Sequence, residues 1–160
     1  MPRPSDLTQL LFMIDTAFDH VSWHGPNLRG SLRGVTPRQA AWRPAPARHN
    51  IWELVVHAAY WKYAAWRRLT GAKRGSFPLK GSNWLPRPTE MSARAWRDDL
   101  DLLADMHQTL RSAVADLAPG DLDRPSAQRS VTRRALVTGV AAHDLYHAGQ
   151  IQLIKRLGGR

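Results

Sequence analysis

Residues 93–117 carry the most regular apolar pattern of the chain. With His107 as the one polar member, the pattern advances in steps of three and four: Ala93, Trp96, Leu100, Leu103, His107, Leu110, Val114 and Leu117. Such spacing places one stripe on one face of an α-helix. Ser92 supplies a helix cap before the stripe, and Pro119-Gly120 supplies a stop after it. The pattern predicts a long amphipathic helix that must bury one face against partners.

A first helix is predicted near the N-terminus, where Ser5 or Asp6 can cap it. Its apolar positions also follow three-and-four spacing: Leu7, Leu10, Leu11, Ile14, Phe18 and Val21. We expect this helix to end near His24-Gly25-Pro26. A short helix is expected after Thr36-Pro37, which reads as a cap and a first helical residue.

Two further long helices are predicted. One begins at a capping box formed by Asn50 and Glu53 and ends at Gly71. The other covers residues 130–157. Their expected inward positions are Leu54, His57 or Ala58, Trp61, Ala65 and Leu69 in the former and Leu136, Val140, His143, His147, Ile151 and Ile154 in the latter. Between the second and third long helices, residues 72–89 are rich in Gly and Pro and predict a long loop. Four long helices without a convincing strand predict an all-α four-helix bundle.

The composition limits the function classes. A chain of 160 residues, 43% of them apolar, can build one core, so we expect a single domain over residues 1–160. The chain has no cysteine, which excludes disulfides, thiolate metal clusters and a cysteine nucleophile. The N-terminus lacks a signal-peptide pattern, and no apolar run approaches the length of a membrane span. We therefore expect a cytoplasmic protein with no membrane partner.

The charge is strongly basic. Lys and Arg number 23 against 13 Asp and Glu, a formal net charge of +10, which is compatible with an anionic partner. The basic residues are scattered, however, and occur only in short groups such as Arg67-Arg68 and Arg133-Arg134. No nucleic-acid-binding motif accompanies them. Nucleic acid is therefore not the expected partner, and a basic nucleic-acid-associated bundle is kept only as an alternative.

His143 and His147 lie four residues apart inside the apolar run of the last helix. Residues four apart share one helix face, so both imidazoles project from the same stripe. A buried imidazole pair must find partners, because each unsatisfied ring costs about 1–3 kcal/mol. A divalent metal ion would satisfy both rings.

His57 is the candidate for completing such a site from a facing helix. It lies at the edge of an inward face in an apolar segment, where a lone histidine is also compatible with plain core packing. A zinc-peptidase helix is the alternative, but it needs a glutamate after the first histidine and a third ligand downstream. Here Asp144 follows His143, and neither His nor Glu follows His147. The peptidase interpretation is therefore not favoured.

Five neighbouring residues are candidates for a pocket or for supporting the site. Asp144 either hydrogen-bonds a ligating imidazole or lies in solvent. Gln150 either orients a metal-bound water or packs against the first helix, and Tyr146 lies in the same turn. Trp61 either walls a pocket or belongs to the core. His107 is a fourth ligand, a base near the site or a hydrogen-bonded core residue, and we expect the last.

The motifs ELVVHAAYW around His57 and HDLYHAGQI around His143 and His147 resemble the DinB/YfiT-like superfamily of small helical metalloproteins. A Trp-His-Gly-Pro segment at residues 23–26 resembles one subgroup of that superfamily. So does the start of the second long helix, which reads His-x-Ile-Trp-Glu-Leu at residues 49–54. These motifs cover nearly the whole chain in the order of the family.

The resemblance implies an up-down-down-up four-helix bundle, here with short extra helical segments in the connections. It also implies that His57, His143 and His147 bind a divalent metal ion, commonly zinc, nickel or iron. Related members are thiol-dependent transferases or isomerases that use a low-molecular-weight thiol, and dimers are common. A small-molecule substrate or thiol and a second copy of the chain are therefore the expected partners.

The residues themselves fit such chemistry. Three neutral imidazoles leave at least one metal position open, as in catalytic sites. A metal lowers the pKa of a bound water or thiol, so hydrolysis and thiol transfer can start from the same centre. Without cysteine, a reactive thiol must come from the ligand. We predict a divalent-metal-binding protein and leave open whether it is an S-transferase or a hydrolase. The alternative is a non-catalytic metal-binding or ligand-sensing bundle, which a fourth ligand such as His107 would favour.

Overall fold

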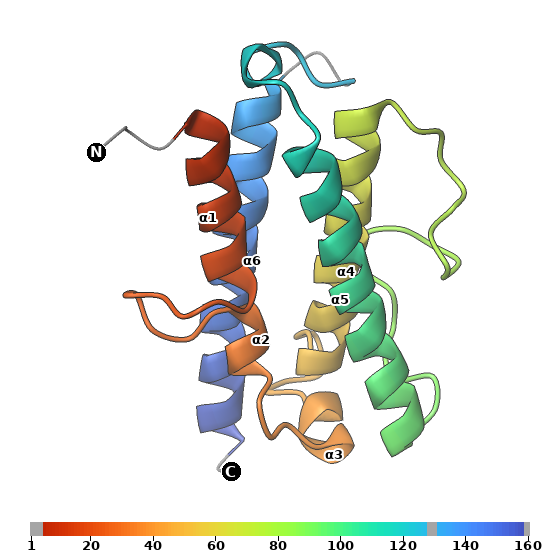
Figure 1. The fold of residues 1–160 in the computed structure, drawn as a ribbon. Helices are drawn as coiled ribbons and strands as arrows, with labels where there is room; N and C mark the ends of the chain where they lie inside the picture. Colours follow the sequence, from red (N-terminus) through yellow and green to blue (C-terminus); the bar gives the residue numbers. More distant parts are fainter. Residues whose placement is uncertain (1–4, 128–130, 159–160) are drawn as a thin grey trace.

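Four long helices form the body of the computed structural model, which describes residues 5–127 and 131–158 (Figure 1). The long helices are α1 (Asp6–Phe18), α4 (Ile51–Thr70), α5 (Ala93–Ala115) and α6 (Arg133–Leu157). The connections contain α2 (Leu28–Ser31), α3 (Pro37–Ala41) and a 3₁₀ turn, η1 (Pro119–Asp121). In the two described ranges there is no β-strand. The predicted all-α bundle with short extra helical segments is confirmed.

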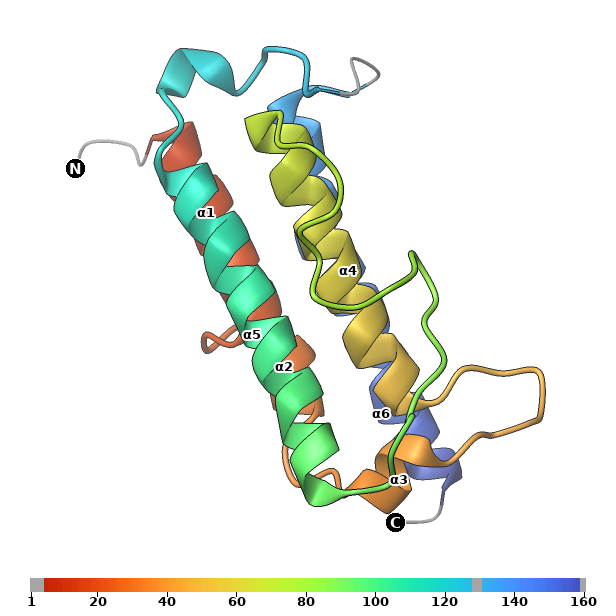
Figure 2. The same ribbon diagram turned by 90° about the vertical axis from the view of Figure 1, so that its right-hand side faces the viewer.

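The helices run in two pairs of opposite direction (Figures 1 and 2). α1 and α6 start at the same end of the bundle, where Arg134 lies 3.0 Å from Asp6. α4 and α5 both start at the other end, where the Trp52 indole donates a hydrogen bond of 2.7 Å to Asp99. Each long helix packs against two others, because α1 and α4 both contact α5 and α6.

Side-chain caps fix the predicted helix starts. In the capping box of α4, Asn50 accepts from the backbone N–H of Glu53 while the Glu53 carboxylate accepts from that of Asn50. Thr36 and Gln39 form a second box at α3. Gly71 ends α4 with φ at 77°, a left-handed conformation that favours glycine. These local signals were readable from the sequence.

The predicted end of the first helix is wrong. α1 ends at Phe18, well before His24-Gly25-Pro26. The side chain of Asn27 donates a hydrogen bond of 2.7 Å to the carbonyl of His20, which turns the chain back toward α2. Val21 is consequently 97% exposed, outside the core in which the spacing had placed it.

The inward face of α6 is also displaced from the prediction. Residues 128–130, at the expected start of this helix, lie outside the described residues, and Thr132 caps the helix. The buried positions are Val137, Val140, Ala141, Asp144, His147, Ala148, Ile151 and Ile154. Leu136 and His143 are only half-buried at the edge of this face. Because α6 packs against both α1 and α4, its buried face is broad and has Asp144 near its middle.

The core consists of two apolar clusters with a polar layer between them. The cluster near the start of α4 includes Trp52, Trp96, Leu103 and Ile151, and the cluster near its end includes Ile14, Leu69, Leu110 and Val137. Between these levels lie Lys62 on α4, His107 on α5 and Asp144 on α6, all buried. The polar layer therefore crosses three of the four long helices.

Lys62 and Asp144 form an ion pair of 2.5 Å, and each side chain is only 1% exposed. The Lys62 ammonium also lies 3.3 Å from Nδ1 of His107, whose ring stacks on Phe18 at 3.7 Å. Burial raises the pKa of Asp144, and the ammonium opposes that rise. Burial, reinforced by Lys62, lowers the pKa of His107 to about 2, so the ring is a neutral acceptor.

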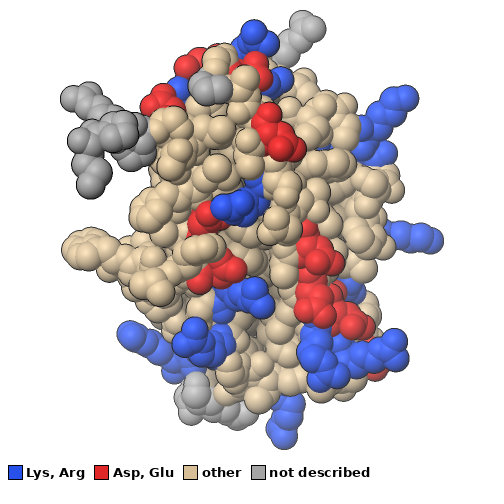
Figure 3. All heavy atoms as spheres, viewed as in Figure 1, with Lys and Arg blue, Asp and Glu red and all other residues tan. Residues whose placement is uncertain are grey.

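The surface carries charges of both signs. On the face formed by α1 and α5, Lys and Arg lie among Asp and Glu (Figure 3), and Arg111 on α5 binds both carboxylate oxygens of Asp15 on α1. Within the described ranges, no helix combines the length and apolar character that crossing a membrane requires.

The buried pair predicts a large stability effect for Lys62→Met. This change leaves Asp144 as an uncompensated buried charge, because its second oxygen, Oδ1, accepts no hydrogen bond from described residues. Urea unfolding should show a loss of about 3–5 kcal/mol in the free energy of unfolding. The double variant Lys62→Met/Asp144→Leu should recover most of the loss, since it removes both charges.

Arg94→Met is the matched control, because Arg94 and Asp98 form an exposed pair at 3.9 Å. Its free energy of unfolding should stay within about 0.5 kcal/mol of the wild-type value. A Lys62→Met variant as stable as this control would show that the buried pair does not hold the helices together.

Candidate metal centre

Three imidazoles from two helices converge on one point. His57 lies on the second turn of α4, and His143 and His147 lie one turn apart on α6. The Nε2 atom of His143 lies 3.2 Å from Nε2 of His57 and 3.0 Å from Nε2 of His147. His57 is 5% exposed and His147 2%, whereas His143 is half-buried. The structure thus brings together the three histidines that the sequence singled out.

Hydrogen bonds at the other ring nitrogens fix two of the tautomers. Nδ1 of His57 lies 3.0 Å from the carbonyl oxygen of Asn83, and Nδ1 of His147 lies 2.7 Å from Oε1 of Gln150. Gln150 in turn donates from Nε2 to the Tyr146 hydroxyl, which directs its amide oxygen toward His147. Because a carbonyl oxygen only accepts, both histidines carry their proton on Nδ1. Their Nε2 lone pairs therefore both point toward His143.

This arrangement fits a metal ion better than it fits three hydrogen-bonded rings. A proton on Nε2 of His143 can be donated to only one of the two facing lone pairs, which leaves the other unsatisfied. A divalent cation accepts all three lone pairs at once, and neutral imidazole nitrogen is a good ligand for zinc, nickel and iron. The donor set of this cluster therefore suits such an ion.

The three rings are neutral at physiological pH. Burial lowers the pKa of His57 to about 4 and that of His143 to about 3. Burial also lowers the pKa of His147, although the hydrogen bond to Gln150 opposes the change. Neutral rings need lose no proton before they coordinate a metal.

The loop between α4 and α5 covers one side of the cluster. Trp84 stacks between His57 and His49, with ring centroids 3.7 and 3.5 Å away. Asn83 has φ at 60°, a conformation that asparagine tolerates better than most residues. Its side-chain oxygen accepts a hydrogen bond of 2.9 Å from the Trp61 indole. The loop is therefore held to α4 on both sides of the Asn83 carbonyl that orients His57.

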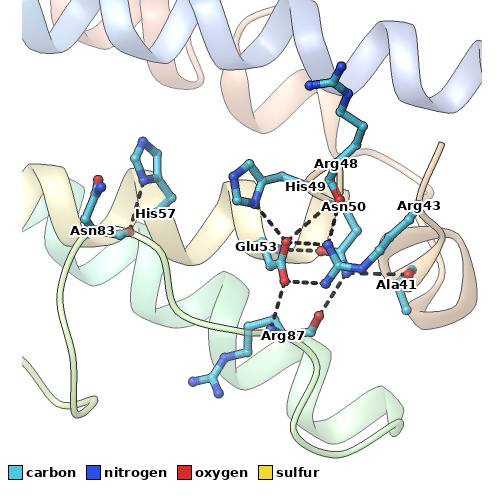
Figure 4. A network of polar contacts seen from close by, with 9 residues as sticks. All are labelled: Ala41, Arg43, Arg48, His49, Asn50, Glu53, His57, Asn83 and Arg87. Atoms are coloured by element: carbon cyan, nitrogen blue, oxygen red, sulfur yellow. Dashed lines mark hydrogen bonds and ion pairs between the residues drawn. The ribbon is translucent and has the colours of Figure 1, made fainter. Parts of the chain in front are cut away.

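A second set of contacts anchors the start of α4 to this loop (Figure 4). The buried Glu53 carboxylate accepts hydrogen bonds from the Arg43 guanidinium and from Nδ1 of His49. Burial alone would raise the pKa of Glu53, but the hydrogen bonds from Arg43 and His49 outweigh it and lower that pKa. The Asn50 amide donates a hydrogen bond of 2.8 Å to the Arg87 carbonyl at the end of the loop. Both sides of the His49–Trp84–His57 stack are thus fixed.

The remaining predicted residues have varied positions. Trp61 is half-buried, with its ring centroid 6.3 Å from that of His143, and it lines a groove rather than the core. Tyr146 is exposed beside His147. Gln150 is half-buried, and its Oε1 atom lies 2.7 Å from Nδ1 of His147, so this amide oxygen holds the His147 ring.

Two predicted residues belong to the core. Asp144 forms no hydrogen bond with the three imidazoles and is not exposed to solvent; it is buried against Lys62, which differs from both interpretations of the sequence. His107 is a hydrogen-bonded core residue, as expected, and does not join the three-histidine cluster.

Sequence reasoning missed Lys62, Asn83 and Trp84. Lys62 gave a readable signal, because it lies four residues after Ala58 on an inward face and its opposite charge, Asp144, lies on the inward face of α6. Asn83 and Trp84 gave none, since nothing in a Gly- and Pro-rich loop tells which residue folds back onto a helix.

The fold and the site together define a class of protein: a helical bundle in which two facing helices bring three imidazoles together. The sequence model of the DinB superfamily matches residues 20–151, which is most of the chain. The chain therefore belongs to the DinB superfamily, and the resemblance seen in its motifs is confirmed. Comparison with curated proteins and with solved structures finds no match.

Substitution of Gln150 should weaken the binding of a metal ion to the three histidines. Gln150→Ala removes the acceptor that orients His147, so affinity for zinc should fall about 10- to 100-fold in competition with a chelating dye. Gln152→Ala, on the same helix, should leave the affinity unchanged. Equal affinities of the two variants would show that the amide oxygen does not position the ring.

The histidine pKa values predict how the stability of the metal-free protein depends on pH. Unfolded histidine binds a proton near pH 6.5, whereas folded His57 stays neutral down to about pH 4. The unfolded state therefore takes up protons first, and the free energy of unfolding falls as pH drops below about 6.5. In chelator-treated samples, the stability advantage of wild type over His57→Gln should shrink between pH 8 and 5. A constant difference would contradict a neutral buried ring.

Proposed function

We propose that His57, His143 and His147 bind one divalent metal ion, and that the protein is a metalloenzyme for thiol-dependent transfer or hydrolysis. The observation that carries the proposal is the convergence of three Nε2 atoms, two of them with fixed lone pairs. Zinc, nickel and iron all suit this nitrogen donor set. Membership of the DinB superfamily supports the same assignment.

A metal ion held by three imidazoles lowers the pKa of a water or thiol that binds it and so supplies a nucleophile near neutral pH. The chain's own residues prepare this chemistry. The Asn83 carbonyl and the Gln150 amide hold two rings in the coordinating tautomer, and Trp84 shields one face of His57 from water. The chain lacks cysteine, so a thiol nucleophile would be the bound small molecule.

A site with three protein ligands favours a catalytic metal ion over a purely structural one. Structural zinc sites are closed by four protein ligands, whereas catalytic sites keep one position for substrate. His107 is the candidate that would have closed the sphere, and it hydrogen-bonds Lys62 instead. This placement supports the enzymatic proposal over a non-catalytic metal-binding or ligand-sensing bundle.

We also propose that the chain forms a homodimer. Exposed apolar side chains on two adjacent helices support this proposal: Phe12 on α1 and Leu145 and Leu153 on α6. Light scattering on the purified protein should give twice the mass of the chain, and a monomer at micromolar concentration would contradict the proposal.

Metal analysis tests the proposed centre. Untagged wild-type protein, incubated with zinc, nickel or iron and then desalted, should hold about one ion per chain by mass spectrometry, since three ligands form one site. His147→Ala should lose the ion, and His24→Ala, which changes an exposed histidine, should retain it. No metal in wild type after any of the three incubations would contradict the centre.

Activity assays on the loaded protein separate the functional alternatives. Transfer of N-acetylcysteine to monochlorobimane and hydrolysis of 4-nitrophenyl acetate are the two probes. A metal-dependent rate that His147→Ala abolishes would support the enzyme. Stoichiometric metal without turnover of either probe would favour a non-catalytic metal-binding role.

A further inference from the structure

A groove of about 280 Å³ lies between α4 and α6 and reaches the three-histidine cluster. His143 and Trp61 lie at one end of it. From there the groove follows α4 for two turns, about 10 Å along the helix axis, to Arg68. Its walls between these ends are apolar and include Ala65, Leu136 and Val140.

Among the residues that the structure describes, no carboxylate pairs with the guanidinium of Arg68. Its guanidinium carbon lies 5.2 Å from the centre of the Trp61 ring, and its Nε atom is buried without a hydrogen-bond partner among the described residues. All thirteen Asp and Glu residues fall within the described ranges, and none of them pairs with Arg68. By contrast, Arg111 and Arg134 each bind an aspartate through two nitrogens.

The position of Arg68 in the last turn of α4 explains only part of this arrangement. Cations interact favourably with the helix dipole at a helix C-terminus. Arg67 lies in the same turn and makes this interaction as well as Arg68 does. The Nε atom of Arg67 is also buried without a partner among the described residues, but Arg67 lies over Tyr63 and outside the groove lining, so its position separates it from Arg68. Burial lowers the pKa of Arg68, and the nearby Arg67 and Arg74 lower it further. An anion beside the guanidinium would relieve both effects.

We propose that this groove binds a small organic anion, a carboxylate on an apolar body. The carboxylate would pair with Arg68, the body would lie on Trp61 and the apolar walls, and the opposite end would reach His143. A guanidinium pairs well with a carboxylate, and an indole face packs well against an apolar body. The inference deepens the proposed function, on which it rests for the chemistry at His143, by naming the substrate class.

The test uses metal-free protein, so that a carboxylate cannot bind through a metal ion. 4-Phenylbutyrate and its neutral analogue 4-phenyl-1-butanol are titrated calorimetrically into wild type, Arg68→Gln and Arg67→Gln, all shown to be equally folded by circular dichroism. Wild type should bind the acid about tenfold more tightly than the alcohol, the effect of one charge-assisted hydrogen-bonded pair. Arg68→Gln should lose that preference, and Arg67→Gln should keep it.

Two results would overturn the proposal. One is a wild type that binds the acid no more tightly than the alcohol, which includes binding of neither. The other is an equal loss of preference in Arg67→Gln and Arg68→Gln, because that would reflect overall charge. Metal content separates this failure from failure of the centre: Arg68→Gln should retain the metal, and His147→Ala should lose it.

Discussion

Lys62 and Asp144 form the ion pair around which α4 and α6 are positioned. The pair lies in a polar layer between two apolar clusters, where neither charge can reach water. Apolar packing alone tolerates small shifts of one helix along another, whereas a buried ion pair is strongly disfavoured when its partners separate. Asp144 follows His143 directly on α6, and Lys62 lies five residues after His57 on α4, so the ion pair and the histidine cluster join the same two helices close to one another. The register that satisfies the buried charges is therefore the register that assembles the imidazole cluster.

The contacts around the cluster determine its chemistry as much as the histidines do. Three converging rings could share protons among themselves, but the Asn83 carbonyl and the Gln150 amide oxygen hold the protons of two rings on Nδ1. The Asn83 carbonyl is in place because Trp61 binds its side chain and Trp84 stacks on His57. A loop without regular structure thus sets the tautomer of a residue on a rigid helix.

Local patterns predicted much of this protein. The spacing of apolar residues predicted the four long helices, and the capping box formed by Asn50 and Glu53 predicted the start of α4. Both signals can be read from the sequence because they depend only on residues close together in the chain. Val21 follows the same spacing yet lies in solvent, since α1 ends at Phe18 and the hydrogen bond from Asn27 to the His20 carbonyl holds the chain in a turn there. His143 was expected inside the stripe and lies at its edge, because periodicity cannot tell how many neighbours a helix has. The three histidines were identifiable by spacing and resemblance, but Asn83 and Trp84 reach them only through folding of the loop.

The most direct test of the account is the protonation state of the histidine rings, read from long-range proton–nitrogen NMR correlations of ¹⁵N-labelled protein. In the metal-free protein, His57 and His147 should show protonated Nδ1 and bare Nε2 at neutral pH. One equivalent of zinc should then shift the Nε2 signals of these two residues and of His143 together. Protonated Nε2 on His57 or His147, or a zinc titration that leaves the three Nε2 signals unchanged, would contradict the convergent metal centre.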